Sequence, residues 1–344
     1  MIQSSKSKQN EEVLDEEFTI SKSPTGKYEE KIRPSKLDEI IGRDLEKATL
    51  KMMVESAQRR KEVIDHILFY GPPGLGKTTF AMAIANEVGA SVKITSGPAI
   101  ERQGDLAAIL TGLKKNDILF IDEIHRLPKV IEEILYPAME DRMLDIVMGK
   151  GPSAKTLRLS LEPFTLIGAT TQIGKISSPM RDRFGLIQRL DFFSEGDLVS
   201  ILDRASRLWN IKIEKDALKI LSGSSRGTAR VGLRLLRRCR DYAESRNMRD
   251  INTEVVKGTI RMLGVDEYGL EKIDRDLLLS LLNNFAGGPI GLSTLAASIS
   301  EDEVTLTDVN EPFLMKCGFI KRTSRGRVLT PKGLKYTESL QYAD

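Results

Sequence analysis

Short, almost continuously apolar runs recur along the first half of the chain and end in polar residues. Residues 67–70 (ILFY) lead into a glycine-rich turn, residues 117–123 (DILFIDE) end in two carboxylates, and residues 164–171 (FTLIGATT) end in two hydroxyls. Such runs are typical of strands buried on both faces of a parallel sheet. Alternation predicts another strand over residues 91–95, and an apolar strand follows at residues 186–190. With helical periodicity between them, these runs predict an α/β domain.

The first long helix is predicted over residues 44–59. Its pattern is amphipathic, with Leu45, Ala48, Met52 and Val54 available for burial.

A β-hairpin is predicted over residues 144–164, where two alternating runs flank the turn sequence GKGPSAK. Ile146, Met148, Leu157 and Leu159 make it apolar. The hairpin is either a partner-binding arm or an edge of the sheet. The arm is favoured, because an exposed apolar sheet edge promotes aggregation.

From residue 194 the pattern becomes fully helical. Serine and threonine starts and glycine stops divide residues 194–265 into four helices, which predicts a small all-helical domain. Arginines spaced four, four and three apart predict a stripe on one helix side. These are Arg226, Arg230, Arg234 and Arg237. Most such stripes are solvated, but Arg230 lies at a helix start, where it can contact phosphate.

The last segment, residues 266–344, reads as three helices followed by a hairpin over residues 319–330. This is the pattern of a winged helix, a variant of the helix-turn-helix DNA readers. Basic residues flank the glycine at the wing tip, which suits phosphate contacts; a solvated turn is the alternative.

Composition and the remaining segments indicate the domain limits and the general class of protein. Residues 1–30 are polar and predict a disordered tail, so the domains are expected at residues 31–193, 194–265 and 266–344. A net charge of +3 is too near balance to indicate nucleic acid by itself. Cys239 and Cys317 lie far apart, which gives a disulfide framework or zinc site no support. Because no membrane-span pattern or signal core occurs, we expect a soluble cytoplasmic protein and no membrane partner.

The strongest chemical motif is GPPGLGKTT, which lies between the first strand and a helix. Glycines allow the backbone N–H groups to surround a polyphosphate, and the helix N-terminus adds positive potential. Lys77 is predicted to bridge the β- and γ-phosphates, and the Thr78 hydroxyl to hold Mg²⁺. A purely structural glycine turn is the alternative, and the flanking strand and helix disfavour it.

Two further strand ends carry candidate chemistry. Asp122 is predicted to hold the Mg²⁺ shell, and Glu123 to orient and deprotonate the attacking water. A hydroxyl at Thr170 or Thr171 can sense the γ-phosphate through that water. His125, in DEIHR, is assigned no chemistry, since a single histidine at a helix start is more often structural or exposed.

Two arginine-containing segments are more ambiguous. Ile32 and Arg33, in an extended entry before Pro34, can touch the base and phosphates of a nucleotide. An arginine after the hydroxyl strand, in PMRDRFG, can reach a neighbouring protomer's nucleotide as an arginine finger. Without the family resemblance, a surface pair with Asp182 is the favoured interpretation of that arginine.

These motifs together resemble the RuvB family, the bacterial Holliday-junction branch-migration motors of the AAA+ superfamily. The phosphate loop and the acid strand ILFIDEIHRL are shared by many AAA+ proteins. Narrower signals are the sequences IRPS, EDRMLDIVMGKGPSAK, IGATTQIGKISSPMRDRFG and GFIKRTSRGRVLTPKG. The resemblance runs from about residue 30 to the end and implies an AAA+ P-loop NTPase domain with a parallel sheet, a helical lid and a winged helix.

The resemblance also implies an activity and partners. It implies a homo-hexameric ring on duplex DNA, driven by ATP with Mg²⁺, which acts in recombination and repair. RuvA would load it on a Holliday junction by way of the hairpin at residues 144–161, and RuvC would resolve the junction. Arg322 and Arg327 would contact DNA.

The family positions also imply roles at the nucleotide. Arg183 is the implied finger, Thr170 or Thr171 the first sensor, and Arg230 the second sensor. The implied nucleotide contacts are Ile32, Arg33, Gly74, Lys77, Thr78, Thr79, Glu140, Asp141, Arg142, Arg183, Phe193 and Arg230.

Four positions depart from the family pattern. Arg142 replaces an aromatic residue, Ala229 and Ser324 replace prolines, and Gln172 replaces a common arginine. Two rival functions remain at this stage: a clamp-loader-like or helicase-loading switch, and a non-enzymatic DNA-binding regulator with a vestigial nucleotide site.

Overall fold

The computed structural model describes residues 32–148 and 155–341. The predicted tail at residues 1–30 and the hairpin turn lie outside these ranges. The chain divides into two units, Met1–Arg33 and Pro34–Asp344. Ile32 and Arg33 belong to the first unit, and the elements below belong to the second. Within the described ranges, no helix has both the length and the hydropathy of a membrane span.

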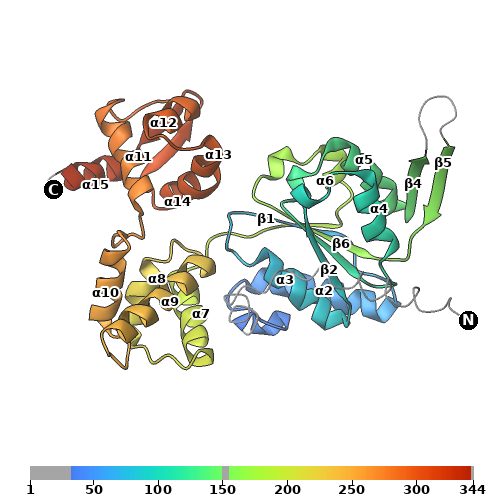
Figure 1. Cartoon of the computed structure of the whole chain (residues 1–344), viewed down its shortest axis with the longest axis horizontal. Coiled ribbons are helices and arrows are strands. Elements are labelled where there is room, and N and C mark those ends of the chain that lie inside the picture. The colour runs from blue at the N-terminus through green and yellow to red at the C-terminus, as the bar shows by residue number, and fades with distance from the viewer. Residues whose placement is uncertain (1–31, 149–154, 342–344) are drawn as a thin grey trace, which may run out of the picture. The chain divides into compact units, whose positions relative to one another are not determined.

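A parallel sheet forms the centre of the first domain (Figure 1). In the described residues its strands are β2 (Val92–Ser96), β3 (Ile118–Asp122), β6 (Thr165–Thr170), β1 (Ile67–Tyr70) and β7 (Leu186–Arg189), in that spatial order. Each neighbouring pair is parallel. The predicted parallel α/β arrangement is confirmed, and the carboxyl ends of β1, β3 and β6 meet at one edge.

The two faces of this sheet pack into separate hydrophobic cores. On β1, Ile67 and Phe69 pack with residues of α2 and α3, whereas Leu68 packs with residues of α4 and α5. Because both faces are buried, the strand sequences are apolar throughout and do not alternate. The helices of this domain are α2 (Asp44–Arg60), α3 (Lys77–Val88), α4 (Gln103–Thr111), α5 (Lys129–Glu140) and α6 (Ser178–Arg181).

The buried face of α2 differs from the prediction. Leu45 is 79% and Met52 61% exposed, while Leu50 and Val54 are buried. Apolar residues lie on more than one side of this helix, so periodicity alone selects no single stripe. Packing against α3 decides the buried side, and the prediction was right only for Val54.

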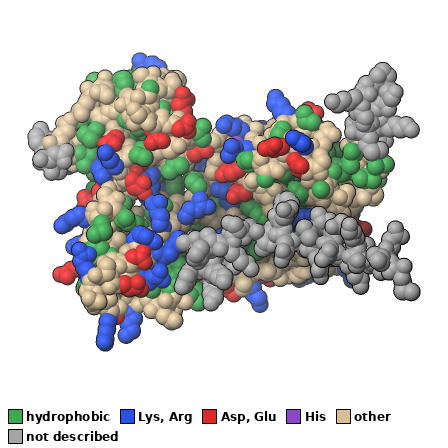
Figure 2. All heavy atoms as spheres, in the orientation of Figure 1, with side chains coloured by type: hydrophobic (Ala, Val, Ile, Leu, Met, Phe, Trp, Pro, Cys, Tyr) green, Lys and Arg blue, Asp and Glu red, His purple; other side chains and the backbone are tan. Residues whose placement is uncertain are grey.

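The hairpin is a separate antiparallel ribbon and not an edge of the central sheet. β4 (Met143–Met148) pairs only with β5 (Lys155–Ser160) among the described strands. Arg158 donates twice to Asp145 across the pair, at 2.7 and 2.9 Å. Leu157 is 41% exposed, and Figure 2 shows hydrophobic side chains on this part of the molecule. The sheet-edge alternative was therefore wrong.

The helical domain consists, in the described residues, of α7 (Glu195–Leu208), α8 (Lys215–Gly223), α9 (Ala229–Ser245) and α10 (Thr253–Met262). Side chains cap three of these helices: Ser194 accepts from Asp197 N, Thr228 from Val231 N, and Asn252 from Val255 N. The Ser194 and Thr228 caps explain why serine and threonine marked the starts of α7 and α9 in the sequence. Lys and Arg side chains lie among Asp and Glu on the viewed face of this domain (Figure 2).

One member of the predicted arginine stripe is buried elsewhere. Arg226 precedes α9 in a left-handed conformation (φ 54°). It is 7% exposed, and its Nη2 donates to Asp274 Oδ1 at 3.2 Å. Its guanidinium also lies 4.5 Å from the Phe313 ring centroid. The stripe prediction is therefore wrong for Arg226, because the turn before α9 rotates it off the helix.

The C-terminal domain has the predicted winged-helix elements and one further helix. Its elements are α11 (Lys272–Asn283), α12 (Leu292–Ser298), α13 (Glu303–Thr305), a π-helix (Leu306–Asn310), α14 (Glu311–Lys316), β8 (Ile320–Thr323), β9 (Gly326–Leu329) and α15 (Pro331–Gln341). α15 was not predicted from the sequence. Its signal is Pro331 at the first helical position, preceded by Thr330, whose Oγ1 accepts from Gly333 N at 3.0 Å.

Replacing Asp274 with Ala is expected to lower the free energy of unfolding by about 3–5 kcal/mol. Asp274 is fully buried, and the change leaves the Arg226 charge unpaired and removes the acceptor of Asn310 Nδ2 at 2.7 Å. Urea denaturation, monitored by circular dichroism, measures the loss in the free energy of unfolding. Asp276→Ala, on a partly exposed position of the same helix, is the control, with a change within about 0.5 kcal/mol. Equal losses in the two variants would contradict a special role for the buried pair.

Candidate nucleotide site

The loop after β1 is shaped by glycines with positive φ. Gly71 (φ 141°) passes so close to β7 that a Cβ there would lie 2.2 Å from Leu190 O. Gly74 and Gly76 also have positive φ, at 80° and 93°, and α3 begins immediately afterwards at Lys77. Only glycine adopts this series without strain, so the sequence dictates a tight loop at a helix N-terminus. The predicted strand, loop and helix context of the motif is confirmed.

Lys77 is held inside this loop. Its Nζ donates to Gly71 O at 2.8 Å and to Pro72 O at 3.0 Å, and the residue is 7% exposed. Burial lowers the pKa of the ammonium to about 8, against the opposing effect of the Glu123 and Asp122 carboxylates. A buried cation at a helix N-terminus fits a polyphosphate.

Glu123 follows Asp122 at the end of β3 in a strained conformation. Its φ is 47°, a left-handed value that costs a non-glycine residue about 1–3 kcal/mol. Its N–H donates to Asp122 Oδ1 at 3.0 Å. The hydrogen bond from His125 holds the pKa of the Glu123 carboxyl below its usual range, with help from the charge of Lys77. Glu123 is therefore an ionised carboxylate at neutral pH, as a general base must be.

The two threonines at the end of β6 have different surroundings. Thr170 is fully buried, and its Oγ1 lies 2.9 Å from His125 Nδ1. Thr171 is partly exposed, and its Oγ1 lies 3.2 Å from Asp308 Oδ2 and 3.5 Å from Glu123 Oε2. Both residues therefore adjoin the acid pair, as the order of β3 and β6 in the sheet requires.

The helical domain reaches the loop through Arg230. A Cβ on Gly74 would lie 2.9 Å from Arg230 Cβ and 3.4 Å from Thr228 Cβ, so the start of α9 packs directly against the glycine. Phe193, at the entry to this domain, donates its N–H to Gly227 O at 2.9 Å. The structure thus brings Arg230, on α9, beside the loop that contains Lys77.

Arg43, which stacks on Phe193, was not predicted from the sequence. The Arg43 guanidinium lies 4.3 Å from the Phe193 ring centroid and donates to Asp191 O. Burial lowers the pKa of Arg43, and the neighbouring carboxylates, Glu46 first, oppose that shift. Arg43 follows Gly42 and has a left-handed conformation (φ 58°). No sequence motif marks it as a site residue.

Arg183 lies in a separate group of residues. Its Nη2 donates to Glu140 Oε2 at 3.0 Å and its Nη1 to Pro179 O at 2.7 Å. The guanidinium covers the Tyr136 ring, 4.5 Å from its centroid. Two predicted nucleotide contacts, Arg183 and Glu140, are therefore paired with each other.

The remaining predicted nucleotide contacts are scattered. Thr78 and Thr79 lie in the first turn of α3, directly after Lys77. Asp141 ends α5, and Arg142 follows it, exposed and with a φ of 56°. Ile32 and Arg33 lie in the first unit, Met1–Arg33.

The predicted DNA contacts on the wing share one buried carboxylate. Arg322 on β8 and Arg327 on β9 both bond to Glu311, which is 1% exposed. Their side chains are 48% and 14% exposed, respectively. Lys321 and Arg325, beside the wing tip, are exposed. Glu311 thus fixes both arginines on the wing, with Arg322 the more accessible.

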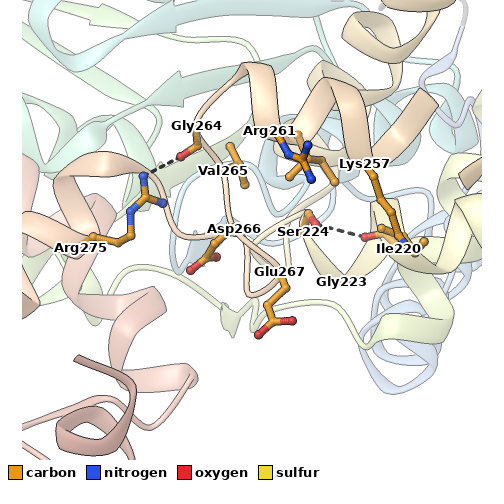
Figure 3. A pocket seen from close by; sticks show the side chains of 11 residues that line it. Ile220, Gly223, Ser224, Lys257, Arg261, Gly264, Val265, Asp266, Glu267 and Arg275 are labelled. Atoms are coloured by element: carbon orange, nitrogen blue, oxygen red, sulfur yellow. Dashed lines mark hydrogen bonds between the residues drawn. The ribbon is translucent and has the colours of Figure 1, made fainter. Parts of the chain in front are cut away.

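A cavity of about 650 Å³ lies outside the nucleotide group (Figure 3). It is lined by α8, α10 and the segment leading to α11. Arg275, in the first turn of α11, also lines it and donates to Gly264 O at 2.9 Å. None of the predicted site residues lines this cavity.

The class of protein follows from the sheet order and the lid contact. β6, which ends in the threonines, lies between β1 of the phosphate loop and β3 of the acid pair, and an arginine of a helical lid rests on the loop. With a winged helix following, this is the architecture of an AAA+ P-loop ATPase.

Three family models match consecutive parts of the chain. They are "Holliday junction DNA helicase RuvB P-loop domain" (residues 32–190), "RuvB AAA lid domain" (193–266) and "RuvB C-terminal winged helix domain" (267–338). The chain therefore belongs to the RuvB family.

Individual relatives agree with this assignment. The chain is 51% identical over 310 residues to the "Holliday junction branch migration complex subunit RuvB" of Fusobacterium nucleatum, a match that covers 90% of this chain and 93% of the relative. The structure of the "RuvB Holliday junction branch migration motor" of Thermotoga maritima superposes with a TM-score of 0.82 at 44% identity, covering 90% and 98% of the two chains. A mutant of the same protein gives a TM-score of 0.83 at 45% identity, covering 89% and 98%.

Proposed function

We propose that this chain is an ATP-driven motor that translocates duplex DNA and drives branch migration of Holliday junctions in recombination and repair. Family membership supports the activity. The observation that carries it here is the single group formed by Lys77, Glu123, Thr170 and Arg230 at one edge of the sheet. A clamp-loader-like switch is less well supported, since all three family models are RuvB domains.

The proposed nucleotide is ATP with Mg²⁺. Lys77 would bind the β- and γ-phosphates, and Thr78 and Asp122 supply the hard oxygen ligands that Mg²⁺ prefers. The metal would neutralise charge on the phosphates. Glu123 would orient and deprotonate the attacking water, while Thr170 or Thr171 senses the γ-phosphate. Gly74 and Thr79 would contribute further phosphate contacts, and Ile32, Arg33 and Phe193 are proposed to contact the rest of the nucleotide.

The second part of the proposal is a homo-hexamer with shared sites. The described contacts of Arg183 are with Glu140, Pro179 and Tyr136 of its own chain, none of which belongs to the phosphate loop. We place Arg183 at the nucleotide of the adjacent protomer, with Glu140, Asp141 and Arg142 nearby. Movement of the helical lid (residues 194–265) through Arg230 would then shift the winged helix (residues 266–344) and its DNA relative to the ATPase domain (residues 31–193).

Partner contacts complete the proposal. The hairpin at residues 144–161 would bind RuvA, because it stands apart from the main sheet and exposes Leu157. Arg322 and Arg327 would contact DNA phosphates on the wing, and RuvC would act on the same junction.

A junction-unwinding assay tests the function. The purified chain with ATP, Mg²⁺ and a RuvA protein is expected to convert a synthetic four-way junction into two duplexes, and to do so poorly without RuvA. A clamp-loader-like switch would hydrolyse ATP without moving the junction, and a vestigial regulator would bind DNA without hydrolysing ATP. Either of those results would overturn the proposal.

A further inference from the structure

Tyr136 lies between the proposed arginine finger and a buried carboxylate, and the roles above give it no function. It belongs to α5, where Glu132, Tyr136 and Glu140 are four residues apart and therefore share one side of the helix. The Arg183 guanidinium lies 4.5 Å from the Tyr136 ring centroid. Because an aromatic face attracts a guanidinium at this distance, Tyr136 is the surface on which Arg183 rests.

The Tyr136 hydroxyl is held in turn by Ser177, the residue that caps α6. Ser177 Oγ donates to Glu132 Oε2 at 2.7 Å. That bond uses the single hydrogen of the serine hydroxyl, so in the 2.9 Å pair of Tyr136 OH with Ser177 Oγ the tyrosine is the donor. Glu132 is only 5% exposed, so water competes little for these bonds. The buried carboxylate therefore orients Ser177, and Ser177 orients Tyr136.

These contacts attach both ends of the segment at residues 177–183 to α5. Ser177, at its start, bonds to Glu132, and Arg183, at its end, donates from Nη2 to Glu140 Oε2 at 3.0 Å. Tyr136 contacts both ends. The only helix in this segment is α6, which has four residues and is too short to be stable by itself. The placement of Arg183 therefore depends on the side chains of α5.

We infer that Tyr136 is a positioning residue for the arginine finger: its ring, anchored by Ser177 and Glu132, fixes the Arg183 guanidinium for use at the adjacent protomer's nucleotide. This inference rests on the proposed ATPase function with shared sites. Tyr136 touches no reacting atom and acts through Arg183. A change at Tyr136 is therefore expected to impair hydrolysis at the neighbour's site and not at the site of its own chain.

Steady-state ATP hydrolysis by the full chain with RuvA and junction DNA measures the effect of two substitutions. Tyr136→Leu removes the ring and is expected to lower kcat about 10- to 100-fold, with KM for ATP within about twofold of the parent, because a small misplacement of a catalytic group is costly. Tyr136→Phe keeps the ring without its anchor and is expected to lose about three- to tenfold, the equivalent of one hydrogen bond. Glu133→Gln, at an exposed position of α5, is the control and is expected to keep the parental kcat.

Mixtures of variants show at which site Tyr136 acts. An equal mixture of Tyr136→Leu with Glu123→Gln contains interfaces at which an intact Glu123 meets an intact Tyr136 and Arg183. It is expected to recover about one quarter of the parental rate. An equal mixture of Tyr136→Leu with Arg183→Ala is expected to stay at or below the rate of Tyr136→Leu alone, because every finger is then impaired.

The opposite pattern, with recovery in the Arg183→Ala mixture only, would place Tyr136 at the nucleotide of its own chain and overturn the inference. So would no recovery in either mixture, which is the result of a general structural defect, or a parental kcat in Tyr136→Leu or Tyr136→Phe. Thermal melting identifies misfolding, and if Tyr136→Leu does not fold, Tyr136→Phe in the same mixtures decides.

The same measurements separate this inference from the proposed function. A parent chain without ATP turnover would refute the proposed function, and this inference with it. If the mixture of Glu123→Gln with Arg183→Ala recovers activity and the mixture of Glu123→Gln with Tyr136→Leu does not, this inference alone fails.

Discussion

The Glu123→Gln variant is expected to bind ATP normally and to lose about 10²–10⁴-fold in kcat. Glutamine keeps the size of the side chain and an acceptor oxygen, but it cannot take a proton from water. The parent carboxyl is ionised at neutral pH, and the His125 hydrogen bond lowers its pKa further. Removing the negative charge also ends its attraction for Lys77, so nucleotide affinity is expected to hold or rise.

Steady-state hydrolysis and binding of a fluorescent ATP analogue measure the two quantities separately. Glu133→Gln, at an exposed position on α5, is the matched control and is expected to keep the parental kcat. A Glu123→Gln variant with the parental rate would show that another group activates the water.

The Arg183→Ala variant is expected to lose about 10³-fold or more in kcat while still binding ATP. Arg183 is oriented before any contact with a neighbour: Glu140 and Pro179 O accept from it, and Tyr136 lies under its guanidinium. A second set of contacts fixes Tyr136, whose hydroxyl lies 2.9 Å from Ser177 Oγ, which donates to the buried Glu132 at 2.7 Å. Such preorganisation lets a guanidinium stabilise transition-state charge without reordering.

The matched control for Arg183 is Arg181, the last residue of α6. Arg181→Ala removes the other arginine of PMRDRFG and is expected to change kcat by less than about threefold, as a partly exposed surface substitution. If Arg181 proved essential and Arg183 dispensable, the arginine finger would be Arg181 and the assignment to Arg183 would be wrong. Binding of the fluorescent analogue by the isolated chain shows whether the nucleotide pocket survives either change.

The sequence predicts the parts of this molecule that local physics determines. A strand buried on both faces must be apolar throughout, and therefore the β1, β3 and β6 regions were recognisable. The glycine loop was equally clear, because Gly71, Gly74 and Gly76 adopt backbone conformations that other residues avoid. Since parallel strands share one carboxyl edge, the polar residues at their ends were expected together.

Other features depend on contacts between distant segments, which no local pattern encodes. The buried face of α2 depends on α3, and the burial of Arg226 depends on Asp274, 48 positions away. The bond between His125 and Thr170 spans 45 positions, and the pair of Arg183 and Glu140 spans 43. His125 directly follows the acid pair in DEIHR, so its position was visible in the sequence while its partner was not.

The central claim is that each ATP site is completed by Arg183 of the neighbouring protomer. Mixing the Glu123→Gln and Arg183→Ala variants tests it most directly, because mixed rings contain sites with an intact Glu123 on one chain and an intact Arg183 on the next. Equal mixing at random is expected to restore about one quarter of the parental ATPase rate, the fraction of such head-to-tail interfaces. A mixture of Glu123→Gln with Lys77→Ala should restore none, since every site then lacks one residue of its own chain. If the first mixture forms mixed rings and yet stays as inactive as its two components, Arg183 does not act across the interface and the account is contradicted.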